Sequence, residues 1–336
     1  MPANLTPDYK KAEAAYRRAS DSREQLELLR EMHRLVPKHK GTEHLRADIK
    51  TRIKELTEEL AGPKKGGARS GPAHVISVEG PAQVALVGPP NSGKSSLHAR
   101  LTGSHTQAAA YPFTTQYPEP GMLAFEDIYI QLVDLPPIAR EHPVPWIGNA
   151  LQPAGACLLV VDLTDPDCVE RLEALVQLLA ERKVYLDGTW PTQKPADRDA
   201  DFFAIHLPTL LVVNKADLLE DSGADLEVFR ELTGLALPAT CLSAKTGVGL
   251  DQLGRWLFDR LGIVRVYTKL PHKPPDMGQP YALPHGSTVH DAAIAIHKEI
   301  AERFQFAKVW GAGDFDGQQV GRDHVLVDGE VLEIHA

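Results

Sequence analysis

Eight consecutive residues have the types and the spacing to bind phosphate. They follow the pattern GxxxxGK[ST] and run Gly88-Pro89-Pro90-Asn91-Ser92-Gly93-Lys94-Ser95, between a β-rich run (84–87) and a helical stretch (96–101). In that context the backbone N–H groups would wrap a β-phosphate, Lys94 would bridge the β- and γ-phosphates, and the Ser95 hydroxyl would bind Mg²⁺. The alternative is a chance glycine-rich turn. The expected phosphate-binding residues are Gly88, Asn91, Ser92, Gly93, Lys94, Ser95 and Ser96.

Two later segments predict recognition of a guanine base. Asn214-Lys215-Ala216-Asp217 follows an apolar run, and in this NKxD pattern the Asp217 carboxylate can accept hydrogen bonds from guanine N1 and N2 while Asn214 orients the loop. Adenine has no matching pair of donors, which disfavours an ATP-using enzyme. Ser243-Ala244-Lys245 then matches a loop whose backbone N–H contacts guanine O6. NKxD alone is a common string, but in this order after a phosphate loop it predicts a guanine-nucleotide site.

A parallel sheet would bring these segments together. From Gln83 onward, short apolar runs alternate with helical stretches, which predicts a mostly parallel sheet covered on both faces. Ligands of such sheets bind at the carboxyl ends of the strands. The runs are 84–87, 128–133, 158–161, 210–213 and 239–242.

The chain divides into three parts. Residues 1–72 predict a basic helical hairpin and linker, with one helix over about 7–36. The α/β domain covers 73–262, and the stretch from about 183 to 207 lacks periodicity and predicts an inserted surface loop. Residues 263–336 predict a small α+β domain, in which one helix runs from about Val289 to Phe304.

Composition and charge narrow the function classes. The chain has 336 residues, of which 43% are hydrophobic, and no apolar run approaches the length of a membrane span, so we expect a cytoplasmic protein without a membrane partner. Its three cysteines form no CxxC pair. The net charge is −9, yet residues 1–69 hold 16 Lys and Arg against 11 Asp and Glu. Any contact with RNA phosphates is therefore expected at the basic end, against the alternative of a solvated helical face. The basic residues considered are Lys38, Lys40, Arg46, Lys50, Arg52, Lys54, Lys64 and Lys65.

With these motifs in place, the chain resembles a translation-factor-class P-loop GTPase and, more narrowly, the Obg/DRG (developmentally regulated GTP-binding) family. The narrower resemblance rests on Tyr111-Pro112-Phe113-Thr114-Thr115, which is similar to the family's switch I, and on 130–136 before switch II. Residues 281–335 are similar to a TGS domain, a ubiquitin-like β-grasp module, and 37–43 are similar to the basic segment before DRG G domains. The resemblance implies a P-loop NTPase G domain of α/β class, preceded by the hairpin and followed by the β-grasp domain.

The resemblance also implies the catalytic residues, which are Lys94, Ser95, Thr115 and Asp134. Thr115 would bind Mg²⁺ from switch I, with Thr114 as the fallback if the register is off by one, and Asp134 would hold Mg²⁺ through water. A simple loop hydroxyl is the alternative for Thr115.

Three positions depart from related patterns. Switch II normally reads DxxG, whose glycine N–H donates to the γ-phosphate, but Pro137 stands at that position and has no N–H. Ile138 occupies the position where Ras-like enzymes have a water-orienting glutamine. An apolar residue there is usual in the Obg/DRG family and indicates slow turnover without a partner. Asn91 replaces a serine typical of DRG proteins. It resembles the asparagine that helps hold a K⁺ beside the phosphates in some GTPases, although a turn-capping role is as good an explanation.

The sequence therefore predicts a GTPase that hydrolyses GTP to GDP and phosphate with Mg²⁺, slowly without a partner or K⁺. Ribosomal or structured RNA would bind through residues 10–65 and a protein partner through the TGS domain. The alternative is a hydrolysis-deficient GTP- or GDP-binding scaffold, which Pro137 favours.

Overall fold

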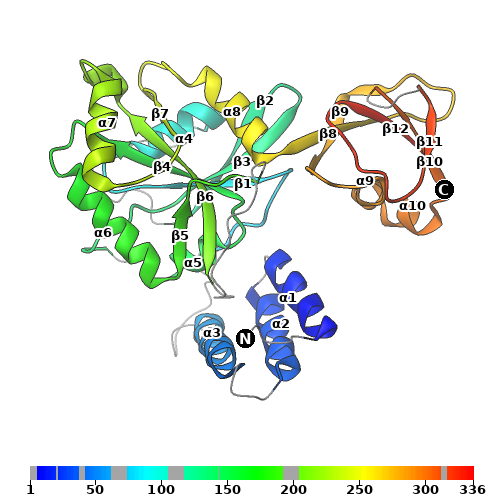
Figure 1. Ribbon diagram of the computed structural model, residues 1–336, viewed down its shortest axis with the longest axis horizontal. Helices are drawn as coiled ribbons and strands as arrows, with labels where there is room; N and C mark the ends of the chain where they lie inside the picture. Colours follow the sequence, from blue (N-terminus) through cyan, green and yellow to red (C-terminus); the bar gives the residue numbers. More distant parts are fainter. Residues whose placement is uncertain are drawn as a thin grey trace, which may run out of the picture.

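Three bodies follow one another along the chain: a helical N-terminal segment, a central α/β domain and a small C-terminal domain (Figure 1). The predicted fold class is confirmed. Among the described helices, none is long and apolar enough to cross a membrane. The computed structural model describes residues 6–19, 22–37, 42–61, 74–104, 117–142, 144–191, 204–311 and 316–336.

The central sheet is mostly parallel, as the apolar runs predict. Its order is β2-β3-β1-β4-β6-β5, with β7 also paired to β6, and every neighbouring pair is parallel except β2–β3. The carboxyl ends of the parallel strands therefore share one edge. The strands are β1 (Gln83–Val87), β2 (Glu119–Phe125), β3 (Ile128–Asp134), β4 (Ala156–Asp162), β5 (Val184–Asp187), β6 (Ile205–Asn214) and β7 (Ala239–Cys241).

Helices cover both faces of this sheet because its strands are apolar on both. Val160 and Val161 are neighbours in β4 but belong to opposite hydrophobic cores. One core includes Leu97 of α4 and Leu257 of α8, and the other includes Leu175 of α6. The helices are α4 (Lys94–Thr102), α5 (Ile147–Leu151), α6 (Cys168–Glu181), α7 (Ser222–Thr233) and α8 (Asp251–Leu261).

The N-terminal segment is helical, but the single helix predicted over 7–36 is wrong. The first helix ends at Arg18, because Ala19 turns to an extended conformation (ψ 126°) and its carbonyl accepts a hydrogen bond of 2.7 Å from the buried Gln25 side chain. Three helices rather than a two-helix hairpin are thus described, and they share a small core that includes Tyr9 and Leu29. They are α1 (Pro7–Arg18), α2 (Ser22–Leu35) and α3 (Glu43–Ala61).

The prediction of a surface loop over about 183–207 is wrong at both ends of this range. Residues Val184–Asp187 form β5, which pairs in parallel with the start of β6, and Val184 is buried. Trp190 is 2% exposed and packs edge-on against Trp256 of α8, with 4.7 Å between ring centroids. This segment therefore completes the sheet and supplies a core residue. Residues 192–203 lie outside the described ranges.

The C-terminal domain has the β-grasp arrangement implied by the resemblance. Its sheet has the order β11-β10-β12-β8-β9, with β8 and β12 parallel at its centre and the other pairs antiparallel. The one helix predicted from Val289 to Phe304 is wrong, because His297 is extended (φ −168°, ψ 134°) and separates two helices. The elements are β8 (Ile263–Thr268), β9 (Asp276–Pro284), α9 (Val289–Ile296), α10 (Lys298–Arg303), β10 (Phe306–Trp310), β11 (Gln318–Val320) and β12 (Glu330–His335).

Replacement of Trp190 tests the structural role of this segment. Trp190→Ala should lower the free energy of unfolding by about 3–5 kcal/mol, because it removes a fully buried indole from the core. Urea unfolding followed by circular dichroism measures the loss. Tyr185→Ala is the matched control, since that ring is 43% exposed on β5. Equal unfolding midpoints for the two variants would contradict the assignment of Trp190 to the core.

Candidate functional site: the carboxyl edge of the central sheet

The phosphate loop turns sharply between β1 and α4, and two of its glycines leave no room for a side chain. A Cβ on Gly88 would lie 2.3 Å from the Val160 carbonyl oxygen. Gly93 has φ +86°, and a Cβ there would lie 2.2 Å from Asn214 Nδ2. The loop is therefore packed directly against the ends of β4 and β6, and the positions of the glycines in the motif have a steric cause.

The chemistry-bearing residues of the loop meet Asp134 at the end of β3. Ser95 Oγ donates a 2.6 Å hydrogen bond to Asp134 Oδ2, and Lys94 is only 5% exposed. Burial lowers the pKa of Lys94 from its usual value, and the charge of Asp134 partly offsets this effect. Ser96, one residue further on, is exposed in the first turn of α4.

Asn214 joins the phosphate loop to the second predicted base-binding loop. Its side-chain Nδ2 donates to the Ser92 carbonyl at 3.0 Å, and its Oδ1 accepts from the Ala244 backbone N–H at 3.1 Å. The side chain is buried, so both bonds are shielded from water. The sequence predicts that Asn214 orients a loop, and the structure places it between two of them.

Lys215 spans from the base-binding motif back to the phosphate loop. Its backbone is left-handed (φ 59°), and its Nζ donates to the Asn91 carbonyl at 3.0 Å and forms an ion pair with Asp162. Asp162 is 8% exposed, and its other oxygen accepts bonds from the backbone N–H and the hydroxyl of Thr164. Asp162 belongs to no sequence motif and was not predicted, although its place directly after the apolar run 158–161 puts it on the same sheet edge.

The remaining base-side residues lie at the same edge. Asp217 is exposed on the short 3-10 turn Ala216–Leu218, which is held by a 3.0 Å bond from Ala216 N–H to the Leu242 carbonyl. Ser243 is buried and its hydroxyl accepts from the Thr246 N–H, while Lys245 is exposed. A carboxylate that faces solvent beside a fixed loop is suited to accept hydrogen bonds from a ligand.

The segment after Asp134 is fastened to β1 and the phosphate loop. Leu135 N–H donates to the Leu86 carbonyl and Ile138 N–H to the Gly88 carbonyl, both at 3.3 Å. Pro136 and Pro137 between them have no N–H. None of the four positions from 135 to 138 thus offers an uncommitted backbone donor in this conformation. Ile138 is 2% exposed and packs into a hydrophobic core, so its side chain cannot orient water.

A cavity of about 620 Å³ opens beside the phosphate loop. Its walls include Pro90, Asn91 and Ile138, together with α6 residues such as Arg171. Asn91 is exposed and left-handed (φ 63°), a conformation that asparagine adopts more readily than most residues, so local geometry alone already favours it there. Thr114 and Thr115 of the predicted switch I lie outside the described residues.

The phosphate loop, the strand-end carboxylate and the two base-side loops converge as they do in P-loop GTPases, and the central domain is one. Two family models match the chain: "50S ribosome-binding GTPase" over residues 83–215 and "TGS domain" over residues 264–336.

Relatives of similar length extend the match to most of the chain. An uncharacterised GTP-binding protein of Halobacterium salinarum is 29% identical, covering 93% of this chain and 98% of the relative. Developmentally-regulated GTP-binding protein 1 of Xenopus laevis is 29% identical, covering 88% and 94%. A crystal structure of a GTP-binding protein from Pyrococcus horikoshii is 18% identical, covering 76% and 99%, with a TM-score of 0.46. The chain is thus similar to GTP-binding proteins of the DRG type over most of its length, and the resemblance stated from its motifs is confirmed.

Asp162 supplies a test of the site geometry. Asp162→Asn keeps an oxygen for Thr164 but removes the negative charge that holds Lys215, so GTP and GDP should both bind about tenfold more weakly, or about 1.4 kcal/mol. Titration with fluorescent GTP and GDP analogues measures this loss. Asp165→Asn is the matched control, because Asp165 pairs with Arg171 on α6 (2.9 Å). Unchanged affinity in Asp162→Asn would show that Lys215 needs no such partner.

Proposed function

We propose that this protein is a GTPase that hydrolyses GTP to GDP and phosphate and acts in the cytoplasm in contact with ribosomal or other structured RNA. The observation that carries the hydrolytic part is the Ser95–Asp134 hydrogen bond of 2.6 Å beside the buried Lys94. P-loop GTPases as a class hydrolyse GTP, which supports the same conclusion.

The residues where Ser95 meets Asp134 fit a magnesium ion. Ser95 and Asp134 bring a hydroxyl and a carboxylate oxygen together, which are hard oxygen ligands of the kind that Mg²⁺ prefers. Ser95 would bind the ion directly, Asp134 through water, and Thr115 from switch I. When bound there, Mg²⁺ would neutralise charge on the β- and γ-phosphates.

The chain's own contribution is positioning and charge. Gly88, Gly93 and the start of α4 direct backbone N–H groups toward the phosphates, where the helix dipole also favours an anion. Lys94 adds a positive charge in a buried position, where screening by water is weak and its attraction for the phosphates is correspondingly strong. Asp217 accepts from guanine N1 and N2. In the Ser243–Lys245 loop the N–H groups of Ser243 and Ala244 are bonded to Val248 and Asn214, so we assign the donor for guanine O6 to the Lys245 N–H.

Switch II favours slow turnover and keeps a second candidate function open. The Ile138 N–H is bonded to Gly88, and Pro137 has no N–H, so this segment supplies neither a γ-phosphate donor nor a group that orients water. A switch I group or a partner must then place the water. If neither does, the protein is a hydrolysis-deficient GTP- or GDP-binding scaffold.

RNA contact is supported by exposed basic side chains on the N-terminal helices. Lys10, Lys11 and Lys50 are exposed, whereas Arg46 is partly buried and donates to the Val36 carbonyl at 3.2 Å. Phosphate contacts from such residues position RNA without reading its sequence. The matched model's description, "50S ribosome-binding GTPase", points to the same partner. We assign a protein partner to the TGS domain. Lys38, Lys40, Lys64 and Lys65 lie outside the described residues.

GTP turnover with Mg²⁺ separates the two candidate functions. We expect slow release of phosphate by the purified protein, and a loss of about 100-fold or more in Lys94→Ala, because a charge that stabilises the transition state is removed. Radiolabelled GTP measures the rate with and without ribosomes. Tight GTP binding without turnover in either condition would favour the scaffold.

Replacement of NaCl by KCl at equal ionic strength tests the role of Asn91. If the Asn91 carboxamide helps hold K⁺ beside the phosphates, turnover should be faster in KCl. Asn91→Gly should abolish the difference and preserve the loop, since glycine tolerates the left-handed backbone. Equal rates in both salts would eliminate the K⁺ hypothesis.

Ribosome binding should be electrostatic and depend on the basic helices. Affinity should fall linearly on a logarithmic scale with salt concentration, and Lys50→Ala should reduce the slope by about one unit if Lys50 contacts a phosphate. Co-sedimentation over a salt series measures both quantities. Lys298→Ala is the matched control, an exposed lysine of the TGS domain. An identical effect of both variants would argue against a contact at the N-terminal helices.

A further inference from the structure

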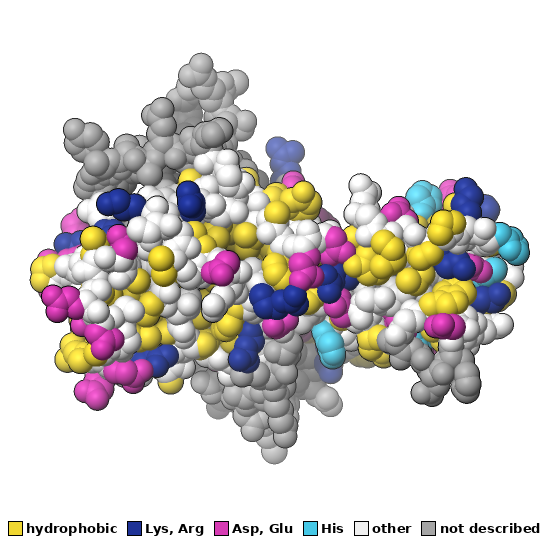
Figure 2. Space-filling model, turned by 90° about the horizontal axis from the view of Figure 1, so that it is seen from above, with side chains coloured by type: hydrophobic (Ala, Val, Ile, Leu, Met, Phe, Trp, Pro, Cys, Tyr) yellow, Lys and Arg dark blue, Asp and Glu magenta, His cyan; other side chains and the backbone are white. Residues whose placement is uncertain are grey.

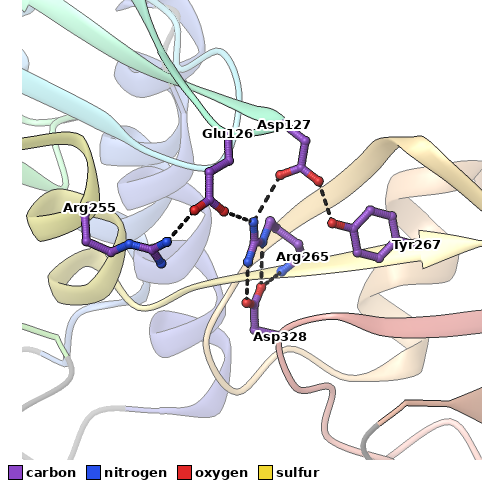
Figure 3. Close-up of polar contacts among 6 residues, drawn as sticks. All are labelled: Glu126, Asp127, Arg255, Arg265, Tyr267 and Asp328. Atoms are coloured by element: carbon purple, nitrogen blue, oxygen red, sulfur yellow. Dashed lines mark hydrogen bonds and ion pairs between the residues drawn. The ribbon is translucent and has the colours of Figure 1, made fainter. Parts of the chain in front are cut away.

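The turn between β2 and β3 contacts β8 of the TGS domain, mainly through Arg265. Arg265 of β8 forms ion pairs with Glu126 and Asp127 at the hairpin tip, the latter at 3.2 Å, and binds Asp328 of the TGS domain through Nε at 3.0 Å and through its terminal nitrogen at 2.8 Å (Figure 3). Arg255 of α8 is also paired with Glu126. In the space-filling view, basic and acidic side chains gather at this junction (Figure 2).

Arg265 itself is more buried than the carboxylates it binds. The Arg265 side chain is 15% exposed and lies over the Phe258 ring of α8, 4.8 Å from its centroid. The Tyr267 hydroxyl donates to Asp127, and this bond raises the pKa of Tyr267 to about 12. Burial alone would raise the pKa of the Asp328 carboxyl, but the bonds and the charge of Arg265 outweigh it and leave that pKa below its usual value. Removal of Arg265 would leave three neighbouring carboxylates, which are 24–39% exposed, without their shared counter-charge.

The backbone of the β2–β3 turn is in a conformation that is energetically unfavourable for a glutamate. Glu126 has φ 50°, a left-handed conformation in which glycine or asparagine is normal. Glutamate gains nothing from this backbone, whereas its carboxylate binds both arginines of the junction. The side chain is therefore explained by the contact across the domains rather than by the turn.

The other end of the same hairpin lies at the nucleotide site. The β2–β3 ladder is continuous from Phe125↔Ile128 at the tip to Glu119↔Asp134, and Asp134 is the residue bonded to Ser95. Along the chain β2 directly follows the predicted switch I. The hairpin is therefore one continuous hydrogen-bonded element that leads from Asp134 to the TGS domain.

We propose that Arg265 is a positioning residue of the GTPase site: the TGS domain, through Arg265, holds the β2–β3 hairpin and with it Asp134 in the arrangement that binds GTP. The inference rests on the proposed function only in the choice of GTP as the favoured nucleotide. Because binding free energies are reciprocal, a nucleotide that moves the hairpin must also change the docking of the TGS domain by the same factor.

The test compares the affinities for a non-hydrolysable GTP analogue and for GDP. Arg265→Gln should change the ratio of the two dissociation constants at least fivefold, mainly through weaker binding of the GTP analogue. Arg265→Lys keeps the positive charge and should bring the ratio part of the way back to the wild-type value. Arg322→Gln is the matched control, since that arginine of the TGS domain lies over Phe304 and donates to its carbonyl. This binding ratio can be read even if the protein hydrolyses no GTP, so failure here is distinct from failure of the proposed function.

A second variant guards against misfolding. Glu126→Gly removes the carboxylate and suits the left-handed backbone, so the hairpin should stay intact while the ratio shifts in the same direction as in Arg265→Gln. In the wild-type protein, the hydrogen-exchange rates of the β8 amides should differ between the GTP-analogue and GDP complexes. In both variants, these rates should be equal in the two complexes. An unchanged affinity ratio in both folded variants would overturn the proposal and leave Arg265 as a static contact between domains.

Discussion

The carboxamide of Asn214 holds the nucleotide site together. One end binds the Ser92 carbonyl and the other binds the Ala244 N–H, so a single buried side chain fixes the distance between the phosphate loop and a base-side loop. The fit depends on Gly93, where any Cβ would collide with this carboxamide. Two short motifs more than a hundred residues apart are thus one steric and hydrogen-bonded unit.

The segments of the proposed nucleotide site could be located from the sequence because each of its loops is a short local pattern at the end of an apolar run. Gly88–Ser95, Asn214 and Ser243 need no long-range information beyond a parallel sheet, whose continuous apolar strands are themselves a local signal. Asp162 was not predicted because a single aspartate after a strand matches no sequence motif. Its partner Lys215 follows a neighbouring strand that lies far away in the sequence.

The errors have physical causes as well. The breaks at Ala19 and His297 fall inside stretches of good helix formers, where a few residues of extended backbone do not disturb the apolar spacing. Strand β5 is an edge strand of four residues, and Trp190 finds its place only through Trp256 of α8. The Arg265 junction was beyond reach of the sequence, since its members come from four separate segments and no periodicity connects them.

The two appended parts of the chain contact the G domain differently. Among the described residues, Asp48 of the N-terminal helices forms an ion pair with Lys183 (3.2 Å); both side chains are 38% exposed, and such a pair contributes about 0–1 kcal/mol. At the TGS domain, Arg265 is only 15% exposed and makes several charge-assisted bonds to the hairpin tip and to Asp328. The exposed Asp48–Lys183 pair would break at little cost if the basic helices adjust to an RNA surface, as we propose. Separation of the TGS domain from the β2–β3 hairpin would instead break the bonds of Arg265 and Tyr267 to the turn of the strands that end at Asp134, which is why we place the proposed control of the nucleotide site in the TGS domain.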